Sequence, residues 1–290
     1  MSEREAMFWA ADGEGAVRCE LCPHGCRIPE GAAGLCGVRE NRDGRLLAAS
    51  WGQISSIALD PIEKKPLYMF HPGSRILSVG SYGCNLRCPF CQNCDISLEY
   101  DNAERNAAML SPEQLTDVAK QAVPGGNIGV AYTYNEPLIG YEFVYDCARL
   151  VREAGMRNVL VSNGYINPEP LERLLPYIDA MNIDLKGFTD GFYHNLGGGP
   201  QAVKETIALA RTRCHVEVTT LIIPGGNDSE AEIARLAAWL ASLDPAIPLH
   251  LSRFFPRYKY ADRRATPRAA VNRLREVAMG YLKNVFVGNM

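Results

Sequence analysis

The sequence predicts an α/β fold, in which a parallel sheet forms a partial (βα)6 TIM-like barrel and a small cysteine-rich module precedes it. From about residue 71 onward, short β-branched runs alternate with longer amphipathic stretches, and neighbouring parallel strands need such crossover helices. Unusual polar residues recur where these runs end. Because a parallel barrel carries its functional residues at the carboxyl ends of its strands, this placement favours the barrel over an open doubly wound sheet. The first 70 residues are rich in Gly and Cys, so we expect two domains, 1–70 and 71–290.

Seven strands and six helices are expected in the barrel. The strands are Arg75–Tyr82, Asn127–Tyr134, Asn158–Asn163, Met181–Leu185, His215–Ile223, Leu249–Phe254 and Asn284–Val287. The helices are Pro112–Ala122, Tyr141–Ala154, Pro168–Ile178, Pro200–Thr212, Glu230–Leu243 and Pro267–Leu282. Ser111, Thr266 and the segment Asp228-Ser229-Glu230 offer capping side chains that accept a hydrogen bond from a free backbone N–H at a helix start. Gly155 stands where a helix should end before the next strand.

Charge and cysteine content limit the classes of function. The net charge is −3 and the pI is about 6.0, so we expect neither a nucleic-acid nor a membrane partner. The charged N-terminus lacks the apolar core of a secretion signal, and no apolar run approaches the roughly 20 residues that cross a bilayer. We therefore expect a cytoplasmic protein. Ten cysteines in a reducing compartment need a reason other than disulfides, and their clustering favours metal or cluster ligation.

One cysteine group follows the first predicted barrel strand. Cys84, Cys88 and Cys91 are spaced by three and two residues, and thiolates at this spacing can converge on one cuboidal iron–sulfur cluster. Three thiolates for four irons leave one iron open to a chelating ligand. Cys94 offers an alternative, because a fourth thiolate would close the cluster and give an electron carrier or a metal-stabilised binding module. We interpret Cys94 as a bystander.

Polar residues also stand at the ends of the strands that follow. Glu136 comes after the second strand, Asn163 ends the third, and His250 lies on the sixth. Asp184 and Lys186 alternate along the fourth strand and share a face, where burial is costly unless they pair or bind a ligand. A structural ion pair at the barrel mouth is the alternative for these two. Because barrel strands end at one edge, we expect these side chains to converge with the cysteine loop.

The second cysteine group lies in the N-terminal module. Cys19, Cys22, Cys26 and Cys36 supply four thiolates within 18 residues. Four thiolates suit either a structural zinc or a second iron–sulfur cluster. A short module with little core of its own gains most from a bound metal. Both alternatives remain open from the sequence.

The motifs together resemble a known family over nearly the whole chain. In order they are Cys-x2-Cys-Pro-x2-Cys, Cys-Asn-Leu-Arg-Cys-x-Phe-Cys-Gln-Asn, Tyr-Asn-Glu-Pro and Asn-Ile-Asp-Leu-Lys. This order resembles the radical S-adenosylmethionine (SAM) enzymes of the AmmeMemoRadiSam system, relatives of pyruvate formate-lyase activating enzyme. Two departures stand out. Cys94 occupies a position that is usually aromatic, and Tyr134-Asn135 replace the two glycines of the family's Gly-Gly-Glu-Pro motif.

The resemblance implies a cofactor set and a chemistry. It implies a [4Fe–4S] cluster with SAM on the open iron, and reductive cleavage of SAM to a 5′-deoxyadenosyl radical that abstracts hydrogen. It leaves the substrate open, with activation of a glycyl-radical protein as one candidate, and implies an electron donor such as flavodoxin or ferredoxin. By the same resemblance the SAM-site residues are Glu136 at the amino group, Lys186 near the methionyl carboxylate, and Asn163, Asp184 and His250 around them.

Overall fold

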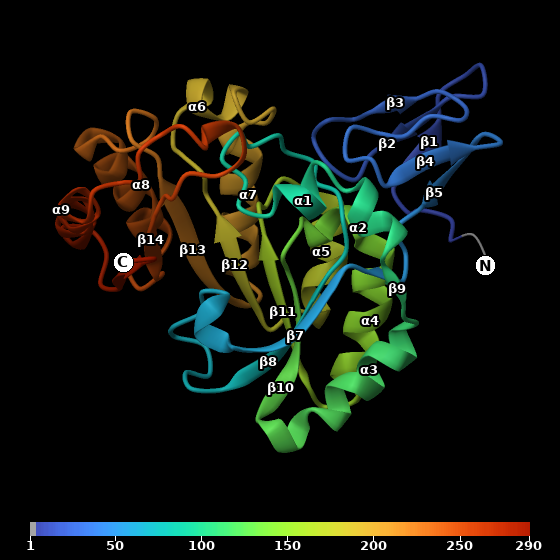
Figure 1. Ribbon diagram of the computed structural model, residues 1–290, viewed down its shortest axis with the longest axis horizontal. Helices are drawn as coiled ribbons and strands as arrows, with labels where there is room; N and C mark the ends of the chain where they lie inside the picture. Colours follow the sequence, from blue (N-terminus) through green and yellow to red (C-terminus); the bar gives the residue numbers. More distant parts are fainter. Residues whose placement is uncertain (1–3) are drawn as a thin grey trace.

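The computed structural model describes residues 4–290 and contains the expected partial barrel (Figure 1). Eight strands form one sheet in the order β15-β14-β13-β12-β11-β10-β8-β7. They are β7 (Ser56–Pro61), β8 (Arg75–Gly80), β10 (Asn127–Tyr132), β11 (Arg157–Ser162), β12 (Ala180–Asp184), β13 (His215–Ile222), β14 (Leu249–Arg253) and β15 (Val285–Gly288). β7 pairs antiparallel with β8, and all the other neighbours pair in parallel. The seven predicted strands are thus confirmed, with ends that differ by one or two residues.

The six predicted helices are also present, and each crosses between two parallel strands. They are α3 (Pro112–Gln121), α4 (Tyr141–Glu153), α5 (Pro168–Leu174), α7 (Pro200–Ala210), α8 (Glu230–Leu243) and α9 (Arg268–Met279). Ser111 and Ser229 cap α3 and α8, each accepting a hydrogen bond from a backbone N–H three residues on. Gly155 ends α4 with a left-handed φ of +73°. Three short helices were not predicted, namely α1 (Cys94–Ser97), α2 (Asp101–Arg105) and α6 (Asp190–His194).

The predicted cap at Thr266 is wrong. The N-cap of α9 is Pro267, without a capping side chain. The Thr266 hydroxyl donates instead to the backbone oxygen of Ile222 (2.6 Å) and accepts from the N–H of Phe254 (3.3 Å). It therefore ties the ends of β13 and β14 together, because it bonds a backbone group at the end of each strand.

The parallel register brings the carboxyl ends of the strands to one edge. Val79 of β8 stands opposite Tyr132 of β10, and Asp184 at the end of β12 stands opposite Thr219 of β13. The segments that follow β8, β10, β11 and β12 therefore leave the sheet beside one another. Apolar side chains of the strands and helices, such as Met181, fill the core below this edge.

The N-terminal module packs beside the barrel, near α1 and α2 (Figure 1). It contains a three-stranded sheet of β1 (Trp9–Ala11), β2 (Val17–Cys19) and β3 (Arg27–Ile28), and a hairpin of β4 (Arg39–Arg42) and β5 (Arg45–Ala48). β6 (Gln53–Ile54) pairs with β9 (Ala108–Met109). Arg39 holds the module to α4 through a buried ion pair with Glu142 (3.0 Å). The strand β7 belongs to the central sheet although it falls within 1–70, and the boundary at residue 70 stays a prediction.

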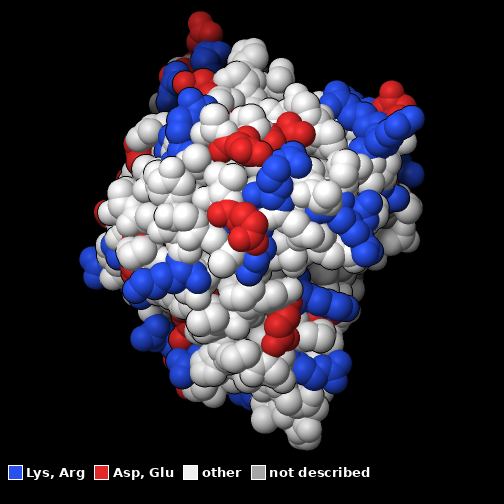
Figure 2. Space-filling model, turned by 90° about the vertical axis from the view of Figure 1, so that its left-hand side faces the viewer, with Lys and Arg blue, Asp and Glu red and all other residues white. Residues whose placement is uncertain are grey.

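On the face that carries α9, basic and acidic side chains are interspersed (Figure 2). Within residues 4–290, none of the helices has the length and apolar character needed to span a bilayer.

Candidate active site

A cavity of about 470 Å³ opens at the carboxyl-terminal edge of the sheet. Seven of the residues predicted for the site line it, and they come from four neighbouring strand ends. They are Cys84, Cys88, Cys91, Glu136, Asn163, Asp184 and Lys186. The expected convergence at the barrel mouth is therefore present for these seven.

The three cysteines lie on the loop that leaves β8. Gly83 opens this loop with a φ of +84°, and a Cβ there would lie 2.8 Å from the backbone oxygen of Cys36. Only glycine combines this conformation with so close an approach to the module. The backbone N–H of Leu86 donates to the Cys84 sulfur (3.4 Å), so the loop already directs a hydrogen bond at a prospective ligand.

The donor set fits a [4Fe–4S] cluster with one open iron. Among the described residues that line the cavity, Cys84, Cys88 and Cys91 are the only cysteines. Burial raises the pKa of the Cys84 thiol and raises that of Cys88 to about 11. In the metal-free chain both are therefore neutral thiols at pH 7, and ligation of iron replaces their protons.

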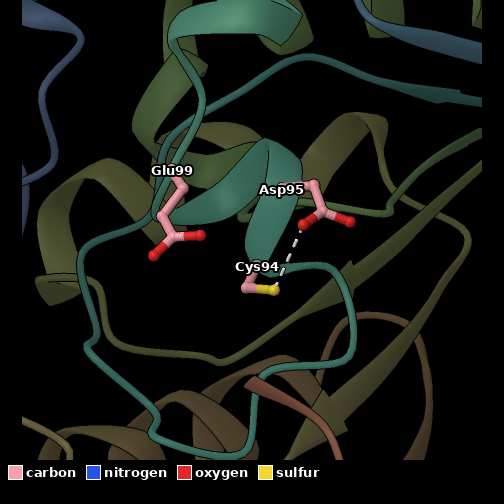
Figure 3. A group of neighbouring side chains, drawn as sticks. All are labelled: Cys94, Asp95 and Glu99. Atoms are coloured by element: carbon pink, nitrogen blue, oxygen red, sulfur yellow. Dashed lines mark hydrogen bonds between the residues drawn. The ribbon is translucent and has the colours of Figure 1, made fainter. Parts of the chain in front are cut away.

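Cys94 belongs to a different neighbourhood. It begins α1, and its sulfur lies 3.4 Å from the carboxylate of Asp95, with Glu99 close by (Figure 3). Asp95 in turn forms an ion pair with Arg257 at 2.5 Å. Cys94 is absent from the lining of the cavity, although its neighbours Asn93 and Ser97 belong to it. This placement supports the bystander interpretation.

Three hydrogen bonds hold the Glu136 carboxylate in the site. One carboxylate oxygen accepts from the Ser162 hydroxyl (2.7 Å) and the N–H of Leu138 (3.0 Å), and the other accepts from the N–H of Asn163 (2.8 Å). Burial raises the pKa of Glu136 to about 7, even though these three donors favour the ionised form. A cation placed beside it would lower that pKa and fix the charge.

Asp184 and Lys186 form an ion pair at the end of β12, with 2.6 Å between the Lys186 Nζ and the Asp184 carboxylate. Their side chains retain 28% and 17% exposure, so both still face the cavity. Burial alone would lower the pKa of Lys186, but the neighbouring Asp184 carboxylate outweighs burial and raises that pKa. The lysine therefore stays cationic, and it has donors left over for a ligand because an ammonium group carries three.

Asn163 connects the cluster loop with Glu136. Its side-chain nitrogen lies 2.9 Å from the Asn85 side-chain oxygen and 3.7 Å from the Cys84 sulfur. Its backbone N–H holds Glu136 at the same time. One residue thus positions both the carboxylate and the first thiol.

His250 lies outside the cavity lining. It is buried, and its Nε2 forms a hydrogen bond of 2.5 Å with Glu217. Ser252, two residues on, does line the cavity, so His250 occupies the layer beneath it on the same face of β14. The sequence indicates which face of the strand such a residue occupies, but it does not indicate how far below the cavity the residue lies.

The structure adds Asp60, Lys65 and Tyr134 to the cavity wall. The Asp60 carboxylate accepts from Lys65 (2.9 Å) and from the Tyr134 hydroxyl (2.8 Å). These bonds outweigh the effect of burial and lower the pKa of Asp60. Tyr134 has a left-handed φ of +74° at a position that is usually glycine in the resembling family. The replacement of glycine by Tyr134 was the signal in the sequence that could have indicated this part of the wall. Asp60 and Lys65 fell within residues 1–70, which we interpreted as a separate module.

The comparisons with known proteins agree with this geometry. The family model described as "Radical SAM superfamily" matches residues 78–238, which is more than half of the chain. The chain is 42% identical to the uncharacterized protein MJ0808 of Methanocaldococcus jannaschii, over 99% of this chain and 85% of that protein. It is 28% identical to pyruvate formate-lyase 1-activating enzyme of Escherichia coli K12, over 57% of this chain and 68% of that enzyme.

A solved structure agrees with the fold. SuiB of Streptococcus suis, in its complex with the precursor peptide SuiA, superposes with a TM-score of 0.56 at 17% identity. The superposition covers 79% of this chain and 51% of that one. The matched segment includes the cysteine loop and the ends of β8, β10, β11 and β12, which carry the seven predicted residues of the cavity. The chain belongs to the radical SAM superfamily.

Proposed function

We propose that Cys84, Cys88 and Cys91 hold the [4Fe–4S] cluster, that the polar wall of the same cavity holds SAM, and that the enzyme abstracts hydrogen from a polypeptide. The observation that carries this proposal is the meeting of three thiols from one loop with charged side chains from other strand ends in one cavity. When bound, the reduced cluster supplies the electron that cleaves SAM to methionine and a 5′-deoxyadenosyl radical.

Glu136 is suited to receive the amino group of SAM. A carboxylate has about four acceptor sites, and three of them are occupied by Ser162, Leu138 and Asn163. Glu136 lines the cavity that the cysteines also line, so one acceptor site is left for a ligand there. An ammonium group there would form a charge-assisted hydrogen bond and would keep Glu136 ionised at pH 7.

Lys186 is suited to receive the carboxylate of SAM, with Asp184 as its positioning residue. The 2.6 Å contact with Asp184 fixes the ammonium group at the cavity wall. Asn163 would stabilise the same complex at the cluster, since its side-chain amide lies beside the Cys84 sulfur. Three thiols leave the fourth iron of a cluster open to a chelating ligand, which is the ligand set that this chemistry needs.

The names of two similar proteins support a polypeptide substrate. The relative from E. coli is an activating enzyme for pyruvate formate-lyase, and the SuiB structure holds a precursor peptide. The test uses cells grown on α-deuterated glycine, whose extract is separated into dialysed protein and small-molecule filtrate. Deuterium in 5′-deoxyadenosine from the protein fraction supports a polypeptide substrate, and deuterium only from the filtrate contradicts it. A one-electron donor of the flavodoxin or ferredoxin class completes the proposal.

The chemistry itself is tested on the anaerobically reconstituted, reduced protein. We expect the electron paramagnetic resonance (EPR) signal of the cluster to change when SAM is added, and 5′-deoxyadenosine to form. Cys88→Ala should abolish both results. Cys147→Ala is the matched control, because Cys147 is a buried cysteine on α4 outside the cavity. A fully loaded, reduced protein that neither responds to SAM nor releases the nucleoside would contradict the proposal.

A further inference from the structure

The N-terminal module contains a second thiol-lined cavity, separate from the one above. Cys19, Cys22, Cys26 and Cys36 all line it, together with apolar side chains such as Leu21. Cys19 ends β2, and the backbone turns back at Gly25, which has a left-handed φ of +53°. The N–H of Cys19 then donates to the backbone oxygen of Cys26 (2.9 Å). The chain is therefore folded so that four thiols spread over 18 residues face one space.

The spacing of these sulfur atoms disfavours zinc. With Zn–S bonds of about 2.3 Å, the ligand sulfurs of a tetrahedral site lie about 3.8 Å apart. Within residues 4–290, no three of the four sulfurs lie within 4.8 Å of one another. The same is true of Cys84, Cys88 and Cys91. Thiolates on the corners of a cuboidal cluster stand further apart than those around a single ion, so a spacing wider than zinc requires favours a cluster.

The surroundings of the cavity offer donors to sulfur. Backbone N–H groups of His24 and Val38 point at the Cys22 and Cys36 sulfurs. Arg39 also lines the cavity, is 1% exposed, and keeps a buried Nε without a hydrogen-bond partner in the described structure. A buried donor without an acceptor is costly, and a thiolate or sulfide of a cluster would supply the acceptor. The cation would also offset part of the negative charge of four thiolates.

We infer that the N-terminal module holds a second [4Fe–4S] cluster, ligated by Cys19, Cys22, Cys26 and Cys36. Four protein thiolates leave no iron open, so this cluster cannot chelate SAM and is confined to holding and exchanging electrons. Asn85 connects the two sites. It lines the second cavity, its side chain contacts the Cys22 sulfur, and it follows Cys84 directly in the chain.

The test counts metals in a variant that lacks the first cluster. Cys84, Cys88 and Cys91 are all replaced by Ala, the full chain is reconstituted anaerobically with iron and sulfide, and iron, sulfide and zinc are measured. We expect about four iron and four sulfide per chain, with an EPR signal after reduction that SAM does not change. About one zinc per chain, or no bound metal, would overturn the inference.

The wild type and a single variant give an independent count if the triple variant does not fold. We expect about eight iron atoms per wild-type chain. Cys26→Ala should keep about four together with the SAM-responsive signal, and Cys214→Ala, a cysteine outside both cavities, should keep about eight. A wild type with only about four iron atoms, all of which Cys26→Ala retains, overturns the inference. Because these counts need no SAM cleavage, they stand apart from the proposed function.

Discussion

Replacing Glu217 with glutamine should lower the free energy of unfolding by about 3 kcal/mol at pH 7. The carboxylate is fully buried beneath the cavity and accepts four hydrogen bonds, from the backbone N–H groups of Tyr68 (3.0 Å) and Met69 (2.7 Å) and from the rings of His215 (2.9 Å) and His250 (2.5 Å). Burial alone would raise its pKa, but these donors outweigh burial and lower the pKa to about 2.

The magnitude follows from the difference between the folded and unfolded states. An unfolded glutamate titrates near pH 4.3, so the gap is about 2.3 pH units, and each unit corresponds to about 1.36 kcal/mol. Because the folded pKa is the lower one, the stabilisation is fully present above about pH 5 and is lost as the pH falls toward 2. Glutamine cannot reproduce it, since one of its two acceptor oxygens has become a donor.

The assay is urea unfolding followed by tryptophan fluorescence, with wild type and Glu217→Gln loaded with cofactors in the same way. Glu172→Gln, an exposed position on α5, is the matched control and should leave the midpoint unchanged. The gap between wild type and Glu217→Gln should narrow as the pH is lowered from 7 to 3. Equal midpoints at pH 7, or a gap that does not depend on pH, would refute the reasoning.

Three further substitutions test the cavity and the sheet edge. Cys94→Ala should keep most of the 5′-deoxyadenosine formation that Cys88→Ala abolishes, and loss in both would contradict the bystander role. Lys186→Met should raise the KM for SAM about tenfold or more, because it removes a charge-assisted hydrogen bond of roughly 1.5–3 kcal/mol, while Lys120→Met on the exposed face of α3 should not change it. Thr266→Val should lower the free energy of unfolding by about 1–3 kcal/mol, since it removes both of these buried hydrogen bonds, and a urea midpoint equal to that of the wild type would count against this role.

The sequence predicted the barrel and most of the cavity because both follow from local patterns. The β-branched runs and the amphipathic stretches each recur with their own period, and parallel strands bring their ends to one edge. Cys84, Glu136 and Asp184 stand directly at such ends and were found for that reason.

The remaining features depend on distances that a pattern does not contain. The depth of His250 depends on Glu217 from another strand, and the role of Thr266 depends on two backbone groups far away in the chain. Asp60 and Lys65 reach the cavity only because β7 pairs with β8. Long-range contacts of this kind decide which polar group is satisfied by which partner, and local propensity does not report them.

The order of strands in the central sheet has a consequence for synthesis on the ribosome. From β7 to β15, the spatial order of the strands follows the order in which they leave the ribosome, apart from β9, which pairs elsewhere. β7 and β8 are close in the chain and pair first, and every later strand finds its partner in the one made just before it. The chain can therefore build its sheet from one edge to the other as it emerges, with low loop-closure entropy at each addition.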